Sequence, residues 1–390
     1  MSAGTGARLG PRVGVRPRSS RTPTRLLLAR TDWGLVLAAS GLSVLGAVLV
    51  WSATRHAWGE AYLVRHLVNL AAGVVLAVVA TRIDFRGLRA LAPWIYLASV
   101  LGLVLVLSPL GTTVNGSHSW IPLPGGMSVQ PSELAKAALA VGLAMLLADR
   151  RERGEPPSHR DVALAWLLVG IPVGLVLLQP DLGSALVLGA LGLGVVTVSG
   201  APRRWLFGVL ALGAAAVTVA LTTPVLSSYQ RDRLIAFVDP SADPTGIGYQ
   251  TRQVRIAIGS GGWDGQGLFH GAQTQGGFIP YQQTDFIFSV AGEELGFLGT
   301  AGVLLLLGFV IVRALVIAVR TRDAFSRLVA VGVASWFTVQ VFENVGMNLG
   351  LMPVTGLPLP FLSYGGSSMF ACWIGVGLLN NAHLAGLRRP

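Results

Sequence analysis

Apolar runs, each about 20 residues long, recur along this chain and constrain its fold more than any other feature. A helix of about 20 apolar residues crosses the ~30 Å hydrocarbon core of a bilayer. Of the 390 residues, 52% are hydrophobic and only 12% are charged, whereas soluble proteins carry about 25% charged residues. The sequence therefore predicts an all-α polytopic membrane protein.

We expect ten transmembrane helices, placed where the apolar runs lie. Their ranges are 33–53, 62–81, 90–108, 132–149, 162–179, 183–199, 205–223, 287–319, 326–345 and 363–383. If the N-terminus lies inside, 21 of the 28 Arg residues fall on the inner side and six on the outer side. Because Lys and Arg are enriched in cytoplasmic loops, both termini are predicted to be cytoplasmic.

The first 31 residues hold seven Arg among Gly, Ser, Thr and Pro. We interpret 1–31 as a disordered basic cytoplasmic tail that is attracted to anionic membrane lipid, and 32–390 as a single transmembrane domain. The net charge of +11 does not indicate a nucleic-acid partner, because most Arg residues flank apolar runs. The chain has one cysteine, Cys372, so no intrachain disulfide forms.

Three outer segments have unusual compositions. Segment 109–131 is rich in turn formers and has no Lys or Arg, and 224–286 is a large extracellular loop between the seventh and eighth helices. Segment 346–368 is nearly all apolar, but its Pro and Gly residues oppose a regular helix. Irregular backbone at membrane depth survives only inside protein or beside a watery cavity. We therefore expect the functional site on this side.

Three carboxylates stand at the mouth of the run 287–319, in the stretch TDFIFSVAGEE: Asp285, Glu293 and Glu294. An ionisable side chain at the centre of a membrane helix costs roughly 2.5–3.5 kcal/mol, so at least one of them is expected to have a function. Asp285 is the candidate general base, and a structural ion pair with Lys136 is the alternative. For Glu293 and Glu294 we expect a structural role as acceptors of hydrogen bonds from buried loops.

Lys136, the only lysine, lies about one turn inside the fourth span in QPSELAK. Glu133 precedes it by three residues and so lies on the same helix face. The two either neutralise each other to fasten the helix or serve the reaction, and we favour a functional Lys136 because buried ionisable groups in membranes are commonly functional. Pro131 is expected to begin this helix, with Ser132 helping to cap it.

The large outer loop supplies cations beside polar and aromatic residues. Arg231, Arg233 and Arg252 are candidates for binding a phosphate group, because guanidinium groups bind phosphate in a bidentate manner; a solvated loop face is the alternative. Trp120 is either a wall of the site or an interfacial anchor. We find no nucleotide-binding glycine motif and no Cys/His metal spacing, and we interpret the glycine-rich 259–267 as loop geometry.

Four stretches, TDFIFSVAGEELG, QPSELAK, QPDLGSA and GLMPVTGLPLPFLSYGGSS, together resemble the SEDS family (shape, elongation, division and sporulation proteins). Within it, GQGLFHGAQTQ and NVGMNLGLMP look more like RodA, the elongation member, than FtsW, the division member. Tyr281 and Gln283 depart from the family pattern, which usually has an acidic residue and a His at these positions.

The resemblance implies a peptidoglycan glycosyltransferase that polymerises lipid II, a polyprenyl-diphosphate-linked disaccharide peptide, at the outer face of the bacterial cytoplasmic membrane. It implies Asp285 as base, Glu133 and Lys136 as further catalytic residues, and Trp120 and Ser363 as substrate contacts. It also implies a class B penicillin-binding protein and other membrane proteins of the elongation complex as partners. The cofactor is unknown, with a divalent cation such as Mg²⁺ or Mn²⁺ as the candidate.

Three other functions stay open at this point. A lipid II flippase would suit the many spans and the irregular intramembrane loops, although no inverted repeat is evident. The division or sporulation paralogue of the same enzyme would share the motifs. A non-catalytic scaffold for a partner enzyme would tolerate replacement of Asp285.

Overall fold

The computed structural model describes residues 30–387 apart from 115, 124–126, 224–227 and 240–242. From Asp32 onward the chain forms one compact unit, and the segment that ends at Thr31 is a separate unit. The predicted basic tail, 1–31, lies almost entirely outside the described residues, so its disorder stays a prediction.

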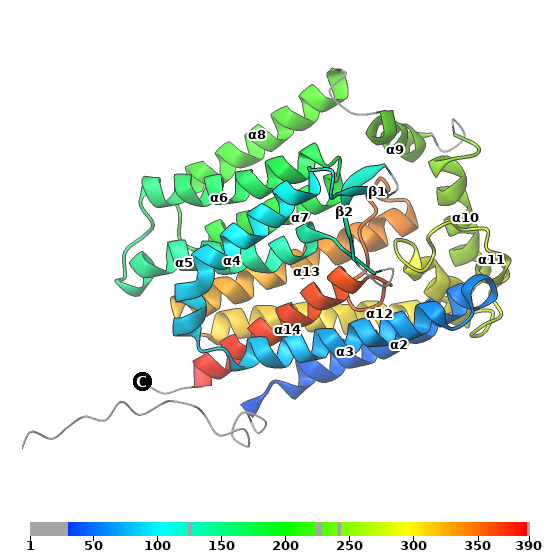
Figure 1. The fold of residues 1–390 in the computed structure, drawn as a ribbon, viewed down its shortest axis with the longest axis horizontal. Helices are drawn as coiled ribbons and strands as arrows, with labels where there is room; N and C mark the ends of the chain where they lie inside the picture. The colour runs from blue at the N-terminus through cyan, green and yellow to red at the C-terminus, as the bar shows by residue number, and fades with distance from the viewer. Residues whose placement is uncertain (1–29, 115, 124–126, 224–227, 240–242, 388–390) are drawn as a thin grey trace, which may run out of the picture. The chain divides into compact units, whose positions relative to one another are not determined.

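Each of the ten predicted spans coincides with a helix (Figure 1). These helices are α2 (Trp33–Trp58), α3 (Ala61–Arg82), α4 (Phe85–Val106), α5 (Pro131–Glu152), α6 (His159–Leu178), α7 (Leu182–Val198), α8 (Arg203–Thr222), α12 (Ile287–Arg320), α13 (Ala324–Leu349) and α14 (Gly366–Leu387). Within the described residues, all of them except α7 and α8 are long and apolar enough to be identified as membrane spans, and α7 is apolar but has only 17 residues. The chain is a helical polytopic membrane protein.

Helices α5 and α13 form the centre of the bundle. Helix α5 packs against α4, α6, α7, α13 and α14, and α13 also contacts α7, α12 and α14. Small residues allow this close approach: a methyl group on Gly332 of α13 would lie 2.8 Å from the Cβ of Ala140 on α5. Helices pack in membranes through such small residues. Polar residues in the middle of this contact are consequently buried inside protein: Glu133 and Lys136 on α5, and Gln340, Glu343 and Asn344 on α13.

The first outer segment forms a small sheet, which the all-α prediction did not include. Strands β1 (Thr112–Val114), β2 (Ser117–Leu123) and β3 (Met127–Val129) pair antiparallel in that order. Antiparallel pairing gives backbone N–H and C=O groups of this segment their hydrogen-bond partners. Its Thr, Val and Ile residues also favour strands. The Ser117 hydroxyl donates a hydrogen bond of 2.8 Å to the Gln179 carbonyl, which fixes the sheet to the turn before α7.

The described part of the large outer loop contains three helices, α9 (Ser228–Val238), α10 (Ile247–Ser260) and α11 (Ala272–Gly276). All three gather at one end of the bundle, at the right of Figure 1, and α10 packs along α12. Helix α14 ends at the opposite end of the bundle (Figure 1). The loop is therefore an ordered cover over one end of the bundle wherever it is described.

Helix α12 is interrupted at Gly296, whose φ is 65°. The glycine-rich stretch inserts into this break: Phe297 N donates to Gly262 O at 2.9 Å, and Gln266 N donates to Glu293 O at 2.9 Å. The backbone groups that the broken helix leaves unpaired thus find partners in the loop, as membrane depth requires. The interpretation of 259–267 as loop geometry is confirmed, and the loop completes α12.

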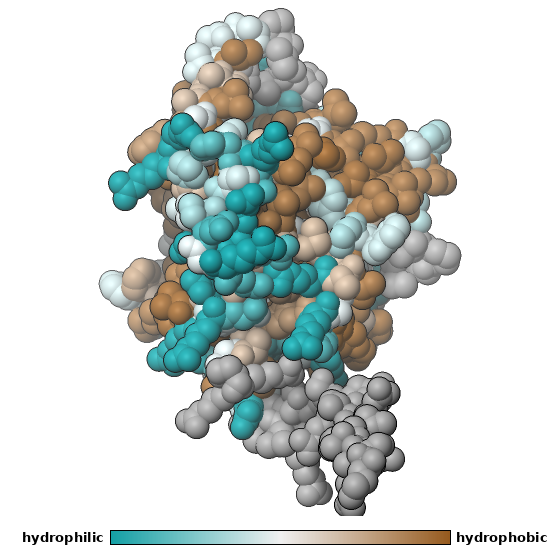
Figure 2. All heavy atoms as spheres, turned by 90° about the vertical axis from the view of Figure 1, so that its left-hand side faces the viewer, coloured by the Kyte–Doolittle hydropathy of each residue, from teal (hydrophilic) through white to brown (hydrophobic). Residues whose placement is uncertain are grey.

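Hydrophilic side chains gather on the opposite end of the bundle, between apolar flanks (Figure 2). Ion pairs link the helix ends there. Arg89 of α4 lies 3.0 Å from Glu152 of α5, and Arg150 lies 2.7 Å from Asp161 of α6. Such charged groups are stable where a helix meets water, and Arg side chains mark that end as the predicted inner side.

Candidate active site

A cavity of about 360 Å³ opens at the end of the bundle that the outer loop covers. Its wall comes from α3, the small sheet, the start of α7, α9, the segment 281–285 and the irregular segments 355–358 and 364–366, together with the start of α14. Among the predicted residues, Asp285, Arg233 and Trp120 line it. Segments far apart in the sequence thus bring the candidate base, a cation and an aromatic ring to one space.

Asp285 is held through its own backbone. It lies one residue before Phe286, which caps α12. Asn344 Nδ2 on α13 donates a hydrogen bond of 2.9 Å to the Asp285 carbonyl and another of 2.7 Å to the Leu357 carbonyl, and Asn348 Nδ2 donates one of 3.2 Å to Asp285 O. Two buried amides therefore fix the main chain of the base, while Asp285 itself lines the cavity.

The surroundings of Asp285 set its protonation. Burial raises the pKa of Asp285 from 3.8 to about 6; the Arg233 guanidinium and a hydrogen bond from Thr284 lower the pKa, and Asp181 raises it. A methyl group on Gly356 would lie 3.4 Å from both Asp285 Oδ2 and Arg233 Nη2. Gly356 has φ 78°, so glycine suits both its backbone conformation and this narrow space. A carboxylate with a pKa just below neutrality suits a general base.

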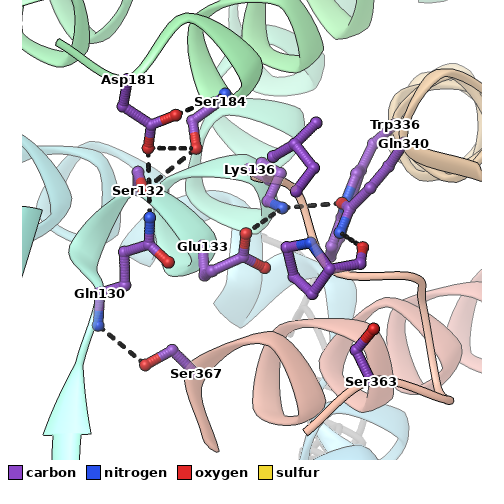
Figure 3. A network of polar contacts seen from close by, with 12 residues as sticks. Gln130, Ser132, Glu133, Lys136, Asp181, Ser184, Trp336, Gln340, Ser363 and Ser367 are labelled. Atoms are coloured by element: carbon purple, nitrogen blue, oxygen red, sulfur yellow. Dashed lines mark hydrogen bonds and ion pairs between the residues drawn. The ribbon is translucent and has the colours of Figure 1, made fainter. Parts of the chain in front are cut away.

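Asp181 also lines the cavity. Its carboxylate accepts a hydrogen bond of 3.0 Å from Ser184 N at the start of α7. The same carboxylate accepts bonds from Ser184 Oγ at 2.7 Å and Gln130 Nε2 at 3.1 Å (Figure 3). Asp181 therefore caps a helix and places a second carboxylate at the cavity wall.

Lys136 and Glu133 lie behind the cavity and do not line it. The Lys136 ammonium donates hydrogen bonds to Glu133 Oε1 at 2.6 Å and to Gln340 Oε1 at 2.8 Å, and both charged side chains are almost wholly buried (Figure 3). Gln340 in turn donates to the Pro358 carbonyl at 2.8 Å. The predicted partner of Asp285 is thus replaced by Arg233, because Lys136 is already paired on its own helix face.

Helix α5 begins as predicted at Pro131, but Ser132 does not cap it. Gln130 occupies the N-cap position and makes no side-chain capping bond. The Ser132 hydroxyl instead lies 3.4 Å from the Ser184 hydroxyl of α7. Proline at the first helical position already removes one of the unpaired donors that a capping side chain would satisfy.

The two glutamates of the TDF stretch hold the outer loop in place, as expected. Glu293 accepts hydrogen bonds from Gln273 N at 2.7 Å and Thr274 N at 2.9 Å at the start of α11. Glu294 accepts a bond of 2.5 Å from the Ser52 hydroxyl of α2. A carboxylate at a helix start satisfies amides that have no partner within the helix. Both carboxylates act as structural acceptors.

The remaining predicted contacts lie outside the cavity wall. Arg231 and Arg252 are exposed, so their binding to substrate stays a prediction. Ser363 is 3% exposed; its hydroxyl donates to Thr284 O at 2.6 Å and accepts from Leu359 N at 2.8 Å. Ser363 therefore supports the residue before Asp285, and its contact with substrate also stays a prediction.

Sequence reasoning missed the α3 side of the cavity, which Tyr62, Arg65 and Asn69 line. Their spacing of three and four residues puts them on one helix face, and this polar face on an otherwise apolar helix was the available signal. The Tyr62 ring packs on Tyr364 with centroids 4.8 Å apart. A second cation, Arg65, thus lines the cavity from α3.

The described residues contain no group of three or more His, Cys, Asp or Glu side chains able to hold a metal ion by themselves. Asp181 and Asp285 do share the cavity wall. Mg²⁺ is commonly bound by one or two carboxylates together with substrate phosphates. The donor set therefore fits a cation that substrate helps to hold.

Known proteins match this chain over most of its length. Residues 28–386 match the family profile described as "Cell cycle protein", which covers FtsW, RodA and SpoVE. The peptidoglycan glycosyltransferase MrdB of Escherichia coli K12 is 38% identical over 357 residues, which cover 90% of this chain and 93% of MrdB. The probable peptidoglycan glycosyltransferase FtsW of Trichlorobacter lovleyi is 38% identical over 375 residues, which cover 94% and 96% of the two chains.

Solved structures match as well. A chain from work on the coordination of polymerization and crosslinking by a peptidoglycan synthase complex is 37% identical, with a TM-score of 0.78 over 92% of this chain and 99% of that one. The rod shape determining protein RodA of Thermus thermophilus is 35% identical, with a TM-score of 0.67 over 92% and 98% of the two chains. The sequence motifs, the helical bundle and the family match over residues 28–386 agree, and the chain belongs to the SEDS family.

Proposed function

We propose that this chain is a peptidoglycan glycosyltransferase that polymerises lipid II into glycan strands at the outer face of the bacterial cytoplasmic membrane. One observation carries the proposal: a single cavity joins a carboxylate of raised pKa, Asp285, with the guanidinium of Arg233. Curated relatives named as peptidoglycan glycosyltransferases that cover at least 90% of this chain support the class of reaction.

Asp285 accepts the proton of the attacking hydroxyl. The acceptor lipid II attacks through the 4-hydroxyl of its terminal sugar, and the carboxylate removes that proton as the new bond forms. One base with direct displacement inverts the anomeric centre, so an α-linked lipid II gives a β-linked glycan. The fixed main chain of Asp285 keeps the carboxylate in place, and such positioning lowers the barrier without new chemistry.

The donor lipid II leaves as a polyprenyl diphosphate, whose growing negative charge requires cations. Arg233, whose charge acts on the base, suits this task. Its Nη1 donates to the Thr355 carbonyl at 2.9 Å, so the guanidinium is oriented before substrate binds. Asp181 and Asp285 would hold a divalent cation with the diphosphate, and that cation would add positive charge there.

We place the cavity on the outer side, with ten spans and both termini cytoplasmic. The excess of Arg at the other end supports this orientation, as does the hydrophilic surface there (Figure 2). With both ends inside, the chain crosses the membrane an even number of times, and α7 and α8 bring the eight spans identified by length and hydropathy to ten.

A class B penicillin-binding protein is the partner that we infer, together with other membrane proteins of the elongation complex. The structural match to a chain of a peptidoglycan synthase complex supports a partner. For the elongation role, the RodA-like stretches 265–275 and 344–353 give the support. Growth of strains depleted of either paralogue and supplied with this gene tests that role, and rescue of the division-defective strain alone contradicts it.

The decisive experiment compares lipid II polymerisation by the wild type and by Asp285→Asn, each purified with the class B protein that co-purifies with it. The exposed Asp264→Asn, outside the cavity wall, is the matched control. We expect glycan chains from the wild type and the control and none from Asp285→Asn. Equal product from all three would remove Asp285 as the base, and product from none, with lipid II translocation in vesicles, would favour the flippase.

A further inference from the structure

Tyr281 begins the turn that carries the candidate base. Its carbonyl accepts hydrogen bonds from Thr284 N at 3.0 Å, from the Thr284 hydroxyl at 3.0 Å and from Asp285 N at 3.2 Å. These bonds hold the backbones of Tyr281 and Asp285 in one tight turn. The Tyr281 side chain therefore leaves the main chain close to the base.

The backbone of Tyr281 has a conformation that aromatic residues rarely adopt. Its φ is 56°, in the left-handed region where the Cβ of an L residue crowds the following carbonyl oxygen. Glycine enters this region without that crowding, and asparagine enters it more readily than most residues. Because strained residues cluster at functional sites, the presence of an aromatic side chain at this position needs an explanation beyond the turn itself.

Packing inside the protein does not supply that explanation. Tyr281 is 45% exposed and lies on the cavity wall with Asp285. Among the described residues, its ring packs on no other aromatic ring and its hydroxyl forms no hydrogen bond. Tyr364 on the same wall differs, because its ring packs on Tyr62 with centroids 4.8 Å apart. The Tyr281 ring is thus available to a molecule in the cavity.

On the basis of the function proposed above, we propose that the Tyr281 ring stacks on the terminal sugar of the acceptor lipid II. The hydroxyl that reacts belongs to this sugar and must come within hydrogen-bond reach of Asp285, so the sugar ring lies beside the turn that begins at Tyr281. The face of an aromatic ring carries partial negative charge. It attracts the partly positive C–H groups on one face of a pyranose, and the contact also removes apolar surface from water.

The test uses substrates that separate acceptor from donor. Lipid II capped at the 4-hydroxyl of its terminal sugar serves only as donor. Lipid II with a methylene group in place of the oxygen between sugar and diphosphate has no leaving group and serves only as acceptor. Each is varied with the other in excess, and the single coupling product is measured. A second series uses the same acceptor without its stem peptide.

The variants separate the ring from the turn. Tyr281→Phe keeps the ring, whereas Tyr281→Asn suits the left-handed backbone and removes the ring. Tyr281→Gly, which also suits φ 56°, repeats the measurement if Tyr281→Asn does not fold. Phe278→Leu is the matched control, because Phe278 is 49% exposed and lies outside the cavity wall. Each variant is the full chain with its class B partner.

We expect Tyr281→Asn to raise the KM for the acceptor about three- to ten-fold, both with and without the stem peptide. Stacking acts alike on bound substrate and transition state, so kcat should stay within about two-fold of wild type, as should the KM for the donor. Tyr281→Phe and Phe278→Leu should retain wild-type constants.

An acceptor KM that is unchanged in Tyr281→Asn would overturn the proposal and leave Tyr281 as a turn residue or an interfacial anchor. A raised donor KM instead would also overturn it, as would a loss that disappears with the peptide-free acceptor, because the ring would then contact the donor or the stem peptide. A wild type without coupling activity would overturn the proposed function itself.

Discussion

The side-chain amide of Asn344 lies 2.9 Å from the main-chain carbonyl of Asp285 and donates a hydrogen bond to it. The same amide bonds Leu357 O at 2.7 Å, so one buried side chain of α13 joins the segment that carries the base to the irregular segment that carries Gly356. The base is thus positioned from behind, through its backbone, by a residue that does not line the cavity.

Replacement of Asn344 by Ala should lower the turnover of lipid II about ten-fold, because loss of the amide releases the Asp285 backbone and a small displacement of a catalytic group is costly. The KM should change little, since Asn344 does not touch the cavity. Steady-state polymerisation by the purified complex measures both constants.

Asn381 of α14 provides a matched control. Its amide also donates to two backbone carbonyls, Ala80 O at 2.8 Å and Ile83 O at 2.6 Å. Both carbonyls lie at the end of α3 that is away from the cavity. Asn381→Ala should cost a similar amount of stability, about 1–3 kcal/mol, without the loss of turnover. Equal turnover in both variants would show that Asn344 has only a structural role.

The pH dependence of the rate should report the neighbours of Asp285. Because its pKa is about 6, the carboxylate is ionised above that pH, and the rate should fall as the pH drops below it. Arg233→Gln removes a charge that lowers the pKa, so the acid limb should move to higher pH. Asp181→Asn removes a charge that raises the pKa, so the limb should move to lower pH.

Asn is also a good N-cap, so Asp181→Asn should keep the start of α7 intact. Arg86→Gln, which changes an exposed arginine outside the cavity, should leave the profile in place. Shifts in the same direction for Arg233→Gln and Asp181→Asn would contradict the assignment of the limb to Asp285. The dependence of kcat/KM on pH from 5 to 9, a range that spans the raised pKa, provides the measurement, because kcat/KM reports groups of the free enzyme.

The raised pKa of Asp285 also has a consequence for stability. Between its ordinary pKa of 3.8 and about 6, the folded protein retains a proton that the unfolded chain has released. Stability contributed by this group therefore decreases as pH rises through that window and stays lower above it.

The sequence predicted the bundle well because membrane spans depend on local hydrophobicity, and all ten runs became helices. It also predicted the side of the bundle that carries Asp285, Arg233 and Trp120. The partner of Asp285 depended on which cation the tertiary fold brings near. Lys136 had a local partner three residues away in Glu133, and this short-range pair prevailed over a pairing across the bundle.

The α3 wall was harder to predict for a physical reason. Arg65 lies near a helix end, where the sequence is equally consistent with an interfacial anchor. Only the packing of α14 against α3 turns the helix face with Arg65 toward Asp285. The small sheet was missed because strands of three residues, such as β1 and β3, are too short for a clear alternating pattern.

Removal of one partner of the Lys136–Glu133 pair should strongly destabilise the protein, whether or not the pair serves the reaction. Lys136→Met leaves Glu133 as a buried unpaired charge, which costs about 3–5 kcal/mol. The double variant Glu133→Gln with Lys136→Met removes both charges and should recover most of that loss. Thermal unfolding of the purified protein in detergent measures the difference.

Arg89→Met serves as the control, because Arg89 pairs with Glu152 near water and such pairs contribute about 0–1 kcal/mol. Polymerisation by the double variant then tests the predicted catalytic role. Wild-type turnover in a folded double variant would show that the pair has only a structural role. Loss of turnover with recovered stability would support a role in the reaction.

Two glycines close to the break in α12 should respond to alanine with opposite signs. Gly265 has φ 81°, and a methyl group there would lie 2.2 Å from Glu294 O. Gly265→Ala should therefore destabilise the fold by about 1–3 kcal/mol through backbone strain and more through the clash. Gly259 of α10 has open space around its Cα, so Gly259→Ala should stabilise by about 0.4–1 kcal/mol. The measurement is the unfolding temperature of each variant, with protease cleavage of the outer loop as a local readout. A tolerated Gly265→Ala would mean that the loop does not complete α12 as tightly as its hydrogen bonds imply.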